Sequence, residues 1–190
     1  MKIRTVFGTI FALSVWYSTP GFAAKCQVPD LSGDVSEAQM SEFYSCIQPK
    51  LQAGYGKKGS EVGTAYVDWK QASKFPAAPG VHSGQHLMTY VNAAGYDAYV
   101  KYDGGAAPVG TVIAKESFTI KSKGKWKKGP LLIMTKVGDS ASATGGWEYT
   151  GVKPNGKKLS VDGPGFCHAC HQAYAHQDSL GYPIPNARVN

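Results

Sequence analysis

GTVIAKESFTI, at residues 110–120, is the clearest β-strand in this chain of 190 residues. β-Branched and aromatic side chains recur along it, as sheets favour. Because successive side chains of a strand point to opposite faces of a sheet, Lys115 falls on the more polar face and Glu116 on the more apolar one. From this pattern alone Lys115 is interpreted as a solvent-facing lysine. A carboxylate on an apolar face must be paired or carry a raised pKa, so we expect a structural partner or a strand-end position for Glu116, with a proton-transfer role as the alternative.

Three further segments have the composition of strands. They are QHLMTYV at 85–91, PLLIMTKV at 130–137 and GGWEYTGV at 145–152. Thr64–Trp69 is another strand candidate, and Asn155-Gly156 is a turn signal. A short helix is expected at Ala93–Tyr102, with Asn92 as its cap. With no internal repeat and no second domain, the pattern predicts an α+β fold: an antiparallel β-sheet with a few helices.

An amphipathic helix precedes these strands. Ser36 and Gln39 form a capping-box pattern. The apolar positions that follow at helical spacing are Met40, Phe43, Tyr44, Ile47 and Leu51. This stripe is typical of a helix that packs on a core. Pro49 is expected to kink or end the helix, and the Gly- and Lys-rich segment Gln52–Gly63 is expected to be a loop.

The first 23 residues have the form of a secretory signal. Lys2 and Arg4 supply positive charge, VFGTIFALSVW at 6–16 supplies a short apolar core, and small residues precede the cleavage point at Ala23. The expected organisation is a signal at 1–23 and one domain at 24–190, exported to the periplasm. No later stretch has the ~20 apolar residues that a membrane span requires.

The chain is mildly basic. Its formal net charge is +7, and loss of Lys2 and Arg4 with the signal leaves +5. In an exported protein this excess does not indicate nucleic acid as a partner, but it suits an acidic redox partner protein. The lysines of KSKGKWKK at 121–128 gather around Trp126, and we interpret this segment as a solvated hairpin loop.

Near its C-terminal end the chain contains Cys167-His168-Ala169-Cys170-His171. This C-x-x-C-H spacing is typical of covalent haem attachment, in which two thiols bond the porphyrin and the following histidine binds the iron. A redox C-x-x-C pair, or half of a zinc site with His168 and His176 as irregular partners, are the alternatives. A redox pair is expected near a βαβ pattern, and a zinc site needs a second regular ligand pair. One haem c is therefore the expected cofactor.

The other two cysteines, Cys26 and Cys46, would lie in an oxidising compartment after export. A disulfide between them is the economical solution. It would tie the segment after the signal to the first helix, in a structural role.

Several residues outside the C-x-x-C-H motif accompany it in a particular order. In sequence order, with the motif included, the series is Thr89-Tyr90-Val91-Asn92, Tyr96, Tyr99, Gly110–Glu116, Trp147, Cys167–His171, Asp178 and Gly181-Tyr182-Pro183. This series resembles the cytochrome P-460 family, which is related to the β-sheet cytochromes c′. The similarity spans 85–183, and the Gly-Thr-Val-x-x-Lys-Glu strand is its most specific part.

The resemblance implies roles for individual residues. Cys167 and Cys170 would hold the porphyrin, and His171 would bind its iron. Lys115 occupies the position of a lysine that forms an additional bond to the macrocycle edge, which distorts the porphyrin. In the family the iron is typically five-coordinate with an open distal face. Its name-giving members oxidise hydroxylamine, the related cytochromes c′ bind nitric oxide or carry electrons, and homodimers are common.

The chain departs from this family pattern on the distal side. Hydroxylamine-oxidising members place a carboxylate on the strand that matches Leu131–Val137, at or beside Met134, and no residue of this strand is acidic. Without that carboxylate a bound nitrogen substrate lacks its expected proton acceptor. Glu148 could replace it only if its strand brings it to the pocket. Enzymatic hydroxylamine oxidation is therefore left open.

The sixth ligand of the iron decides between two functions. With an open distal face, the chain is a P-460-type haem protein for small nitrogen ligands such as hydroxylamine or nitric oxide, with electron transfer. With a sixth protein ligand, it is a non-enzymatic electron-transfer cytochrome. Met134 could be that ligand, although core packing is the plainer interpretation. We expect His82, His86 and His176 to be surface or loop residues rather than ligands.

Overall fold

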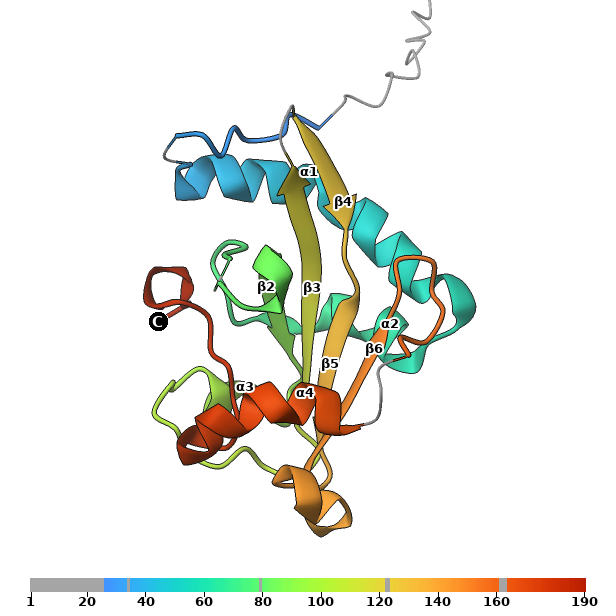
Figure 1. Cartoon of the computed structure of the whole chain (residues 1–190), viewed down its shortest axis with the longest axis vertical. Coiled ribbons are helices and arrows are strands. Elements are labelled where there is room, and N and C mark those ends of the chain that lie inside the picture. The colour runs from blue at the N-terminus through green and yellow to red at the C-terminus, as the bar shows by residue number, and fades with distance from the viewer. Residues whose placement is uncertain (1–25, 34, 79, 122–123, 161–163) are drawn as a thin grey trace, which may run out of the picture.

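The structure is a computed structural model that describes residues 26–33, 35–78, 80–121, 124–160 and 164–190. The expected signal at 1–23 lies outside this part of the chain. Within it, six strands form one antiparallel sheet in the order β1-β2-β3-β5-β6, and β4 pairs with β3 on the edge that also carries β5 (Figure 1). The strands are β1 (Lys70–Gln71), β2 (His86–Val91), β3 (Val112–Lys121), β4 (Lys125–Lys128), β5 (Leu131–Lys136) and β6 (Trp147–Val152).

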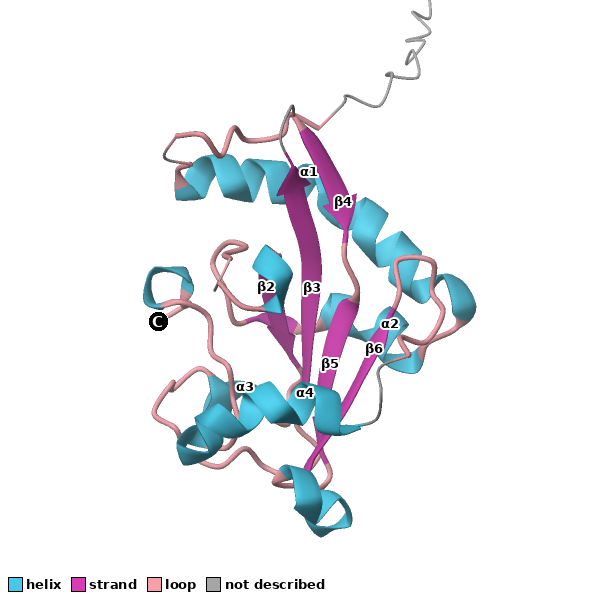
Figure 2. Ribbon diagram, in the orientation of Figure 1, coloured by secondary structure: helices cyan, strands magenta, loops and turns pink. Residues whose placement is uncertain are grey.

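Helices lie before, between and after the strands, so the α+β fold expected from the sequence is confirmed (Figure 2). The α-helices are α1 (Glu37–Tyr55), α2 (Glu61–Ala65), α3 (Tyr96–Tyr99) and α4 (Pro164–His171). The 3-10 segments are η1 (Gly56–Lys58), η2 (Tyr66–Asp68), η3 (His82–Gly84), η4 (Gly138–Thr144), η5 (Gln172–Gln177) and η6 (Pro185–Ala187). No helix in the described ranges has the length and apolar character needed to cross a membrane.

β3 is buried on both faces of the sheet. α1 covers one face, where Phe43 packs edge-to-face on Phe118 with ring centroids 5.7 Å apart. α4 crosses the other face, in front of the strands in Figure 1. On that side Ile113, Met134 and Tyr149 occupy paired positions of β3, β5 and β6. We call the two sides the α1 face and the α4 face. Strand alternation therefore sorts residues between two packed layers rather than between core and solvent.

α1 begins where the sequence predicts and ends later. Ser36 accepts a hydrogen bond from the Gln39 backbone and the Gln39 side chain accepts one from the Ser36 backbone, so the capping box is present. The helix continues through Pro49, however, and the prediction that Gln52–Gly63 is a loop is wrong. The cause is tertiary packing: Tyr55, in the last turn, is fully buried against the sheet.

Two further local predictions are wrong. Thr64–Trp69 is not a strand; it contains the end of α2 and η2, because Ser60 caps α2 by accepting a hydrogen bond from the Gly63 backbone at 3.1 Å. Asn92 does not cap α3, whose cap position is Gly95. The Asn92 side chain instead accepts a hydrogen bond at 3.0 Å from the backbone N–H that begins β3.

Part of the Lys-rich segment is a strand rather than a solvated loop. β4 pairs with the end of β3, so an antiparallel pair of strands does occupy this part of the chain. Trp126 of β4 turns inward and packs edge-to-face on Phe43 of α1, with ring centroids 6.0 Å apart. The aromatic side chain thus belongs to the α1 layer, while Lys125 and Lys127 are exposed.

The predicted disulfide is present. Cys26 and Cys46 are bonded, with their Cα atoms 5.7 Å apart. Because Cys46 lies within α1, the bond fixes the segment that precedes the helix against it. Its role is structural, as expected.

Glu116 lies fully buried on the α1 face, in the middle of β3. Tyr66 and Tyr44 donate hydrogen bonds to its two carboxylate oxygens, at 2.5 and 2.7 Å. Tyr90 in turn contacts the Tyr44 hydroxyl, and Gln48 donates to Tyr90 at 2.7 Å. The expectation of a structural partner is confirmed. Burial raises the pKa of Glu116 to about 7, against the lowering effect of the two tyrosine hydrogen bonds.

Glu116 should make the stability of the protein depend on pH. Its pKa is about 7 in the folded protein and is expected near the ordinary 4.5 in the unfolded chain, so the folded state binds the proton more tightly. The stabilisation is complete below pH 4.5 and is lost as the pH rises through about 7, by up to about 3 kcal/mol. Glu116→Gln has no proton to lose here. The free energy of urea unfolding of the wild type, relative to this variant, should therefore fall between about pH 5 and about pH 8.

The exposed Glu148 supplies the matched control. Glu148→Gln should leave the pH dependence of unfolding as it is in the wild type. If the difference in unfolding free energy between wild type and Glu116→Gln is the same at about pH 5 and about pH 8, the raised pKa of Glu116 is contradicted.

Candidate functional site

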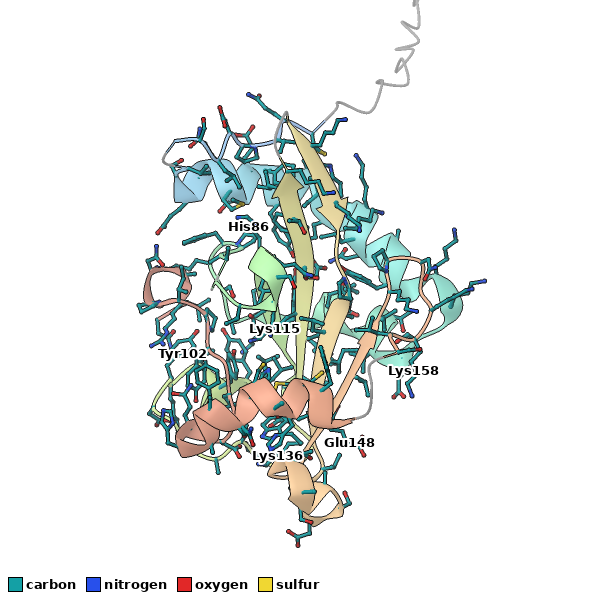
Figure 3. All side chains as sticks on the ribbon, in the orientation of Figure 1. His86, Tyr102, Lys115, Lys136, Glu148 and Lys158 are labelled. Carbon is teal, nitrogen blue, oxygen red and sulfur yellow. A yellow bond between two sulfur atoms is a disulfide. The ribbon has the colours of Figure 1, made fainter. Side chains whose placement is uncertain are left out.

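α4 and the α4 face of the sheet enclose two adjoining cavities. The first, of about 430 Å³, lies between α4 and strands β3, β5 and β6, and its lining is mostly apolar. The second, of about 410 Å³, is bounded by β2 and the segment Gly181–Arg188. The residues that line both are His82, Lys115, Cys170 and His171. Figure 3 shows Lys115 on β3 above α4. Each cavity has the volume of a typical cofactor pocket.

The C-x-x-C-H residues lie on α4 and face this space. Cys167 is half-buried, Cys170 is exposed, and both are free thiols. His171 is buried, and its Nδ1 lies 2.8 Å from the Ser179 carbonyl oxygen. A carbonyl only accepts, so Nδ1 carries the proton and donates it, which leaves Nε2 free to bind a metal. Burial lowers the pKa of His171, and the neutral imidazole is the form that metals bind. The ring centroid of Tyr149 lies 5.2 Å from that of His171.

The geometry does not support the two alternative interpretations of the motif, a redox pair or half of a zinc site. A redox C-x-x-C pair needs a thiol with a lowered pKa, whereas burial raises the pKa of Cys167. A zinc site needs a cluster of at least three ligands, and no such group of His, Cys, Asp and Glu side chains occurs within the described residues.

The carbonyl that orients His171 belongs to a loop held by Asp178. Asp178 and Ser179 both have left-handed backbone conformations, with φ of 55° and 60°, which cost roughly 1–2 kcal/mol each for residues with a side chain. The groups that donate to Asp178 are Lys136 Nζ (2.5 Å) and Ala107 N (2.8 Å) to its carboxylate, and Trp147 Nε1 (2.8 Å) to its carbonyl. These contacts place the Ser179 carbonyl beside the imidazole. The sequence pattern includes Asp178 but predicts no role for it, and no sequence pattern indicates a role for Lys136.

Lys115 is not a solvent-facing lysine. It is buried on the α4 face, and its Nζ donates a hydrogen bond to the Gly181 carbonyl. Burial lowers its pKa to about 8. The interpretation from strand alternation is wrong because α4 and the C-terminal segment cover the face that was taken for the exposed one. Lys115 and His171 line the same two cavities, which is the proximity that the family resemblance implies.

The comparison with known families agrees with this arrangement. The family model described as Cytochrome P460 matches residues 63–180, more than half of the chain. The chain belongs to the cytochrome P460 family. The match begins upstream of the stretch 85–183 that carries the resemblance, and it takes in η2 and most of α2. No curated protein matches the sequence. Cytochromes of this family bind haem, so the cavities beside His171 are considered as a haem site.

The residues present fit a haem group. One helix offers two free thiols and an imidazole whose Nδ1 is already satisfied. The first cavity offers apolar walls, among them Ile113, Met134 and Tyr149. The second offers the cationic side chain of Arg188, which suits carboxylate substituents.

β5, the strand that the resemblance matches to the carboxylate-bearing strand of the family, has no acidic residue. Met134 is buried and lines the first cavity beside Ile113. Glu148 is paired with Thr135 rather than with Met134, so its side chain lies on the opposite face of the sheet, and it is exposed. Among the described residues no carboxylate lines either cavity. Glu148 therefore does not replace the family carboxylate.

The three histidines expected at the surface or in loops have different positions. His176 is exposed in η5, as expected. For His86 the expectation is wrong, because it is buried in β2 and stacks on Phe118, with ring centroids 5.3 Å apart. His82 does lie in a loop, but η3 brings it into the cavities, where its ring centroid is 6.2 Å from that of His171. No sequence pattern marks His82, because only the folded chain brings its loop beside His171.

Removal of the Asp178 carboxylate should loosen the loop that orients His171. Asp178→Ala loses the Lys136 ion pair and the Ala107 hydrogen bond, and a partly buried lysine remains unpaired. We expect the free energy of unfolding to fall by about 2–3 kcal/mol. Asp178→Asn keeps an acceptor and tolerates the left-handed backbone, so it should lose less. Chemical denaturation of the haem-loaded protein measures both.

Asp139, an exposed carboxylate in η4, gives the matched control. Asp139→Ala should change stability by no more than about 0.5 kcal/mol. Equal losses for Asp178→Ala and Asp139→Ala would show that the Asp178 contacts do not hold the loop.

Proposed function

We propose that this chain is an exported mono-haem c-type cytochrome of the P460 type, which binds small nitrogen ligands such as hydroxylamine or nitric oxide and exchanges electrons with a partner protein. The observation that carries the proposal is the set of groups on one side of the cavities: two free thiols and an oriented, neutral imidazole on α4. The signal-like segment at 1–23 supports export to the periplasm, where disulfides such as Cys26–Cys46 persist.

In this proposal each motif residue has a defined task. The Cys167 and Cys170 thiols would hold the porphyrin by adding to its two vinyl groups, with each thiol hydrogen going to the neighbouring vinyl carbon, so no oxidant would be needed. His171 would bind iron through Nε2, while the Ser179 carbonyl keeps Nδ1 protonated and the ring in place. The bound haem supplies a one-electron couple and a metal for small ligands.

Lys115 lines both cavities, which supports a contact with the macrocycle edge. We propose that it forms the additional bond typical of the family: one N–H bond of its amine and one C–H bond of the macrocycle are replaced by a C–N bond. This exchange would release two electrons and two protons, and an oxidant of the peroxide class would have to take up the electrons. The Gly181 carbonyl, which accepts a hydrogen bond from Nζ, holds the amine at that edge.

The proposal covers ligand binding and electron transfer rather than hydroxylamine oxidation. Oxidation requires a group that takes protons from the bound nitrogen. The family uses a carboxylate for this, and within the described residues the cavities contain none. The exposed lysines of β4 lie at the opposite end of the sheet from α4 (Figure 1), so the partner protein need not dock there. The exposed Cys170 side of α4 is nearer to the site.

Covalent attachment can be tested on the purified protein under denaturing conditions. Haem should stay with the wild-type chain through acid–acetone extraction and denaturing electrophoresis. The double variant Cys167→Ala/Cys170→Ala should release it, because only axial ligation and packing then remain. His176→Ala, which changes an exposed residue, should behave as wild type. Extraction of haem from the wild-type chain would overturn the c-type assignment.

The Lys115 bond has its own test. Lys115→Ala should move the ferrous absorption band to the shorter wavelength of an ordinary c-type haem, and its haem peptide should lack the cross-link. The intact wild-type mass should be smaller by two hydrogens than that of an unlinked haem protein. Lys158→Ala alters an exposed lysine outside both cavities and serves as the control. An unchanged spectrum in Lys115→Ala would exclude the bond while leaving the thioether attachment intact.

A further inference from the structure

We propose that a patch of five lysines beside the first cavity is the docking surface for an acidic redox partner protein. The patch lies on η1 and on the hairpin that follows β6, and its members are Lys57, Lys58, Lys153, Lys157 and Lys158. The inference rests on the proposed function, since it requires an electron-carrying haem in the cavities. It adds to that function the surface on which the partner binds and the charge of that partner.

Direct backbone contact brings the two segments of the lysine patch together. The hairpin is closed by the Lys153 N–H, which donates to the Lys157 carbonyl oxygen at 2.7 Å. Near its tip Gly156 has a φ of 82°, and a Cβ atom there would lie 2.7 Å from the Lys58 backbone nitrogen. Only glycine fits so close an approach. Figure 1 shows the loop after β6 beside the end of α1, where η1 begins. The five lysines therefore share one region of the surface.

The charges of the lysine patch are not neutralised by neighbouring carboxylates. Lys57, Lys58, Lys157 and Lys158 are exposed, and none of the five lysines forms an ion pair with another described residue. The net charge of the chain without its expected signal is +5, so the patch alone holds as much positive charge as the whole excess. The rest of that chain is balanced. Such an asymmetric charge distribution steers an oppositely charged protein to one side of the molecule.

The lysine patch adjoins the first cavity at the β6 edge of the sheet. Lys58 and Lys158 line a third cavity of about 370 Å³, and Ile133 and Thr150 line both this cavity and the first one. Leu159, the residue after Lys158, lines the first cavity. A protein bound to the lysines therefore lies close to the space proposed for the haem. Electron transfer between proteins requires such closeness, because its rate falls steeply with the distance between the two cofactors.

Apolar side chains at the first cavity supply a second element of the docking surface. Phe166, near the start of α4, is 67% exposed and lines this cavity together with the half-buried Leu159. Aromatic residues are enriched at the centres of protein interfaces, whereas charges at the rim mainly raise the rate of association. An apolar centre with a cationic rim suits the small, short-lived complexes that redox proteins form.

An anionic membrane surface is the other partner that a group of lysines attracts. Two features of the patch favour a protein instead. Attachment to lipid needs charge alone, whereas this patch is combined with an exposed aromatic side chain at the first cavity. A lipid surface bound to the lysines would also lie against that cavity, where it would hinder the approach of a redox partner. Charge complementarity together with this position therefore selects an acidic redox protein.

The test follows, by stopped-flow absorption, the transfer of one electron from a reduced, acidic [2Fe–2S] ferredoxin to the ferric, haem-loaded protein. The patch variant is Lys57→Gln/Lys157→Gln/Lys158→Gln. The matched control, Lys70→Gln/Lys74→Gln/Lys101→Gln, removes three exposed charges in and around β1, at the other edge of the sheet.

At low salt the patch variant should accept the electron about tenfold more slowly than wild type, or slower still, and the control variant within about threefold of wild type. Rising ionic strength should slow the wild type steeply and the patch variant less, because salt screens the attraction. With an uncharged hydroquinone as the reductant, all three proteins should react at the same rate.

The outcomes separate this inference from the proposed function. With haem bound, equal slowing of both variants overturns the patch as a docking surface, since net charge alone then steers the ferredoxin. Equal rates for wild type and patch variant also overturn it, as does loss of binding to phosphatidylglycerol vesicles in the patch variant without slower electron transfer. A wild-type rate that does not depend on ionic strength overturns it without any variant. A wild-type chain that carries no haem overturns the proposed function itself.

Discussion

The burial of β3 on both faces is the constraint on which the rest of the structure depends. A strand covered on one side by α1 and on the other by α4 cannot direct charge into water. Yet Lys115 and Glu116 stand next to each other at its centre. Each is compensated within its own layer: Glu116 by the Tyr44 and Tyr66 hydroxyls, and Lys115 by the Gly181 carbonyl. The sheet thereby separates a structural polar cluster from a cavity that holds a buried amine.

That separation also explains how α4 becomes a binding element. The helix itself carries the thiols and the imidazole, but the orientation of His171 comes from the loop that follows. Asp178 takes up the charge of Lys136, and its left-handed backbone turns the Ser179 carbonyl toward the ring. A short ion pair between β5 and this loop thus fixes a tautomer on α4. The orientation of His171 therefore depends on contacts outside α4.

Sequence patterns were informative wherever the signal was local. The capping box at Ser36, the strand at 110–120 and the C-x-x-C-H spacing each depend on residues close together in the chain. The sequence patterns gave wrong predictions where contacts between distant parts of the chain decide the structure. Pro49 does not end α1 because the following turns are buried, and Lys115 is not exposed because α4 covers a face that alternation alone assigns to solvent. His82 shows the same limit: only the folded chain brings η3 to His171.

Among the described residues, the strand pairing of the sheet, rather than the choice of one side chain, keeps carboxylates out of the cavities. Ile113, Met134 and Tyr149 share the α4 face because they are paired across β3, β5 and β6. Glu116 and Glu148 lie an odd number of positions from Ile113 and Tyr149 in their strands. Their side chains therefore lie on the other face of the sheet. A change of rotamer cannot bring either into the cavities. Only a one-residue shift in register could, and it would reverse every side chain of the strand and destroy both packed layers. Within the described residues, the sheet therefore brings no carboxylate into either cavity.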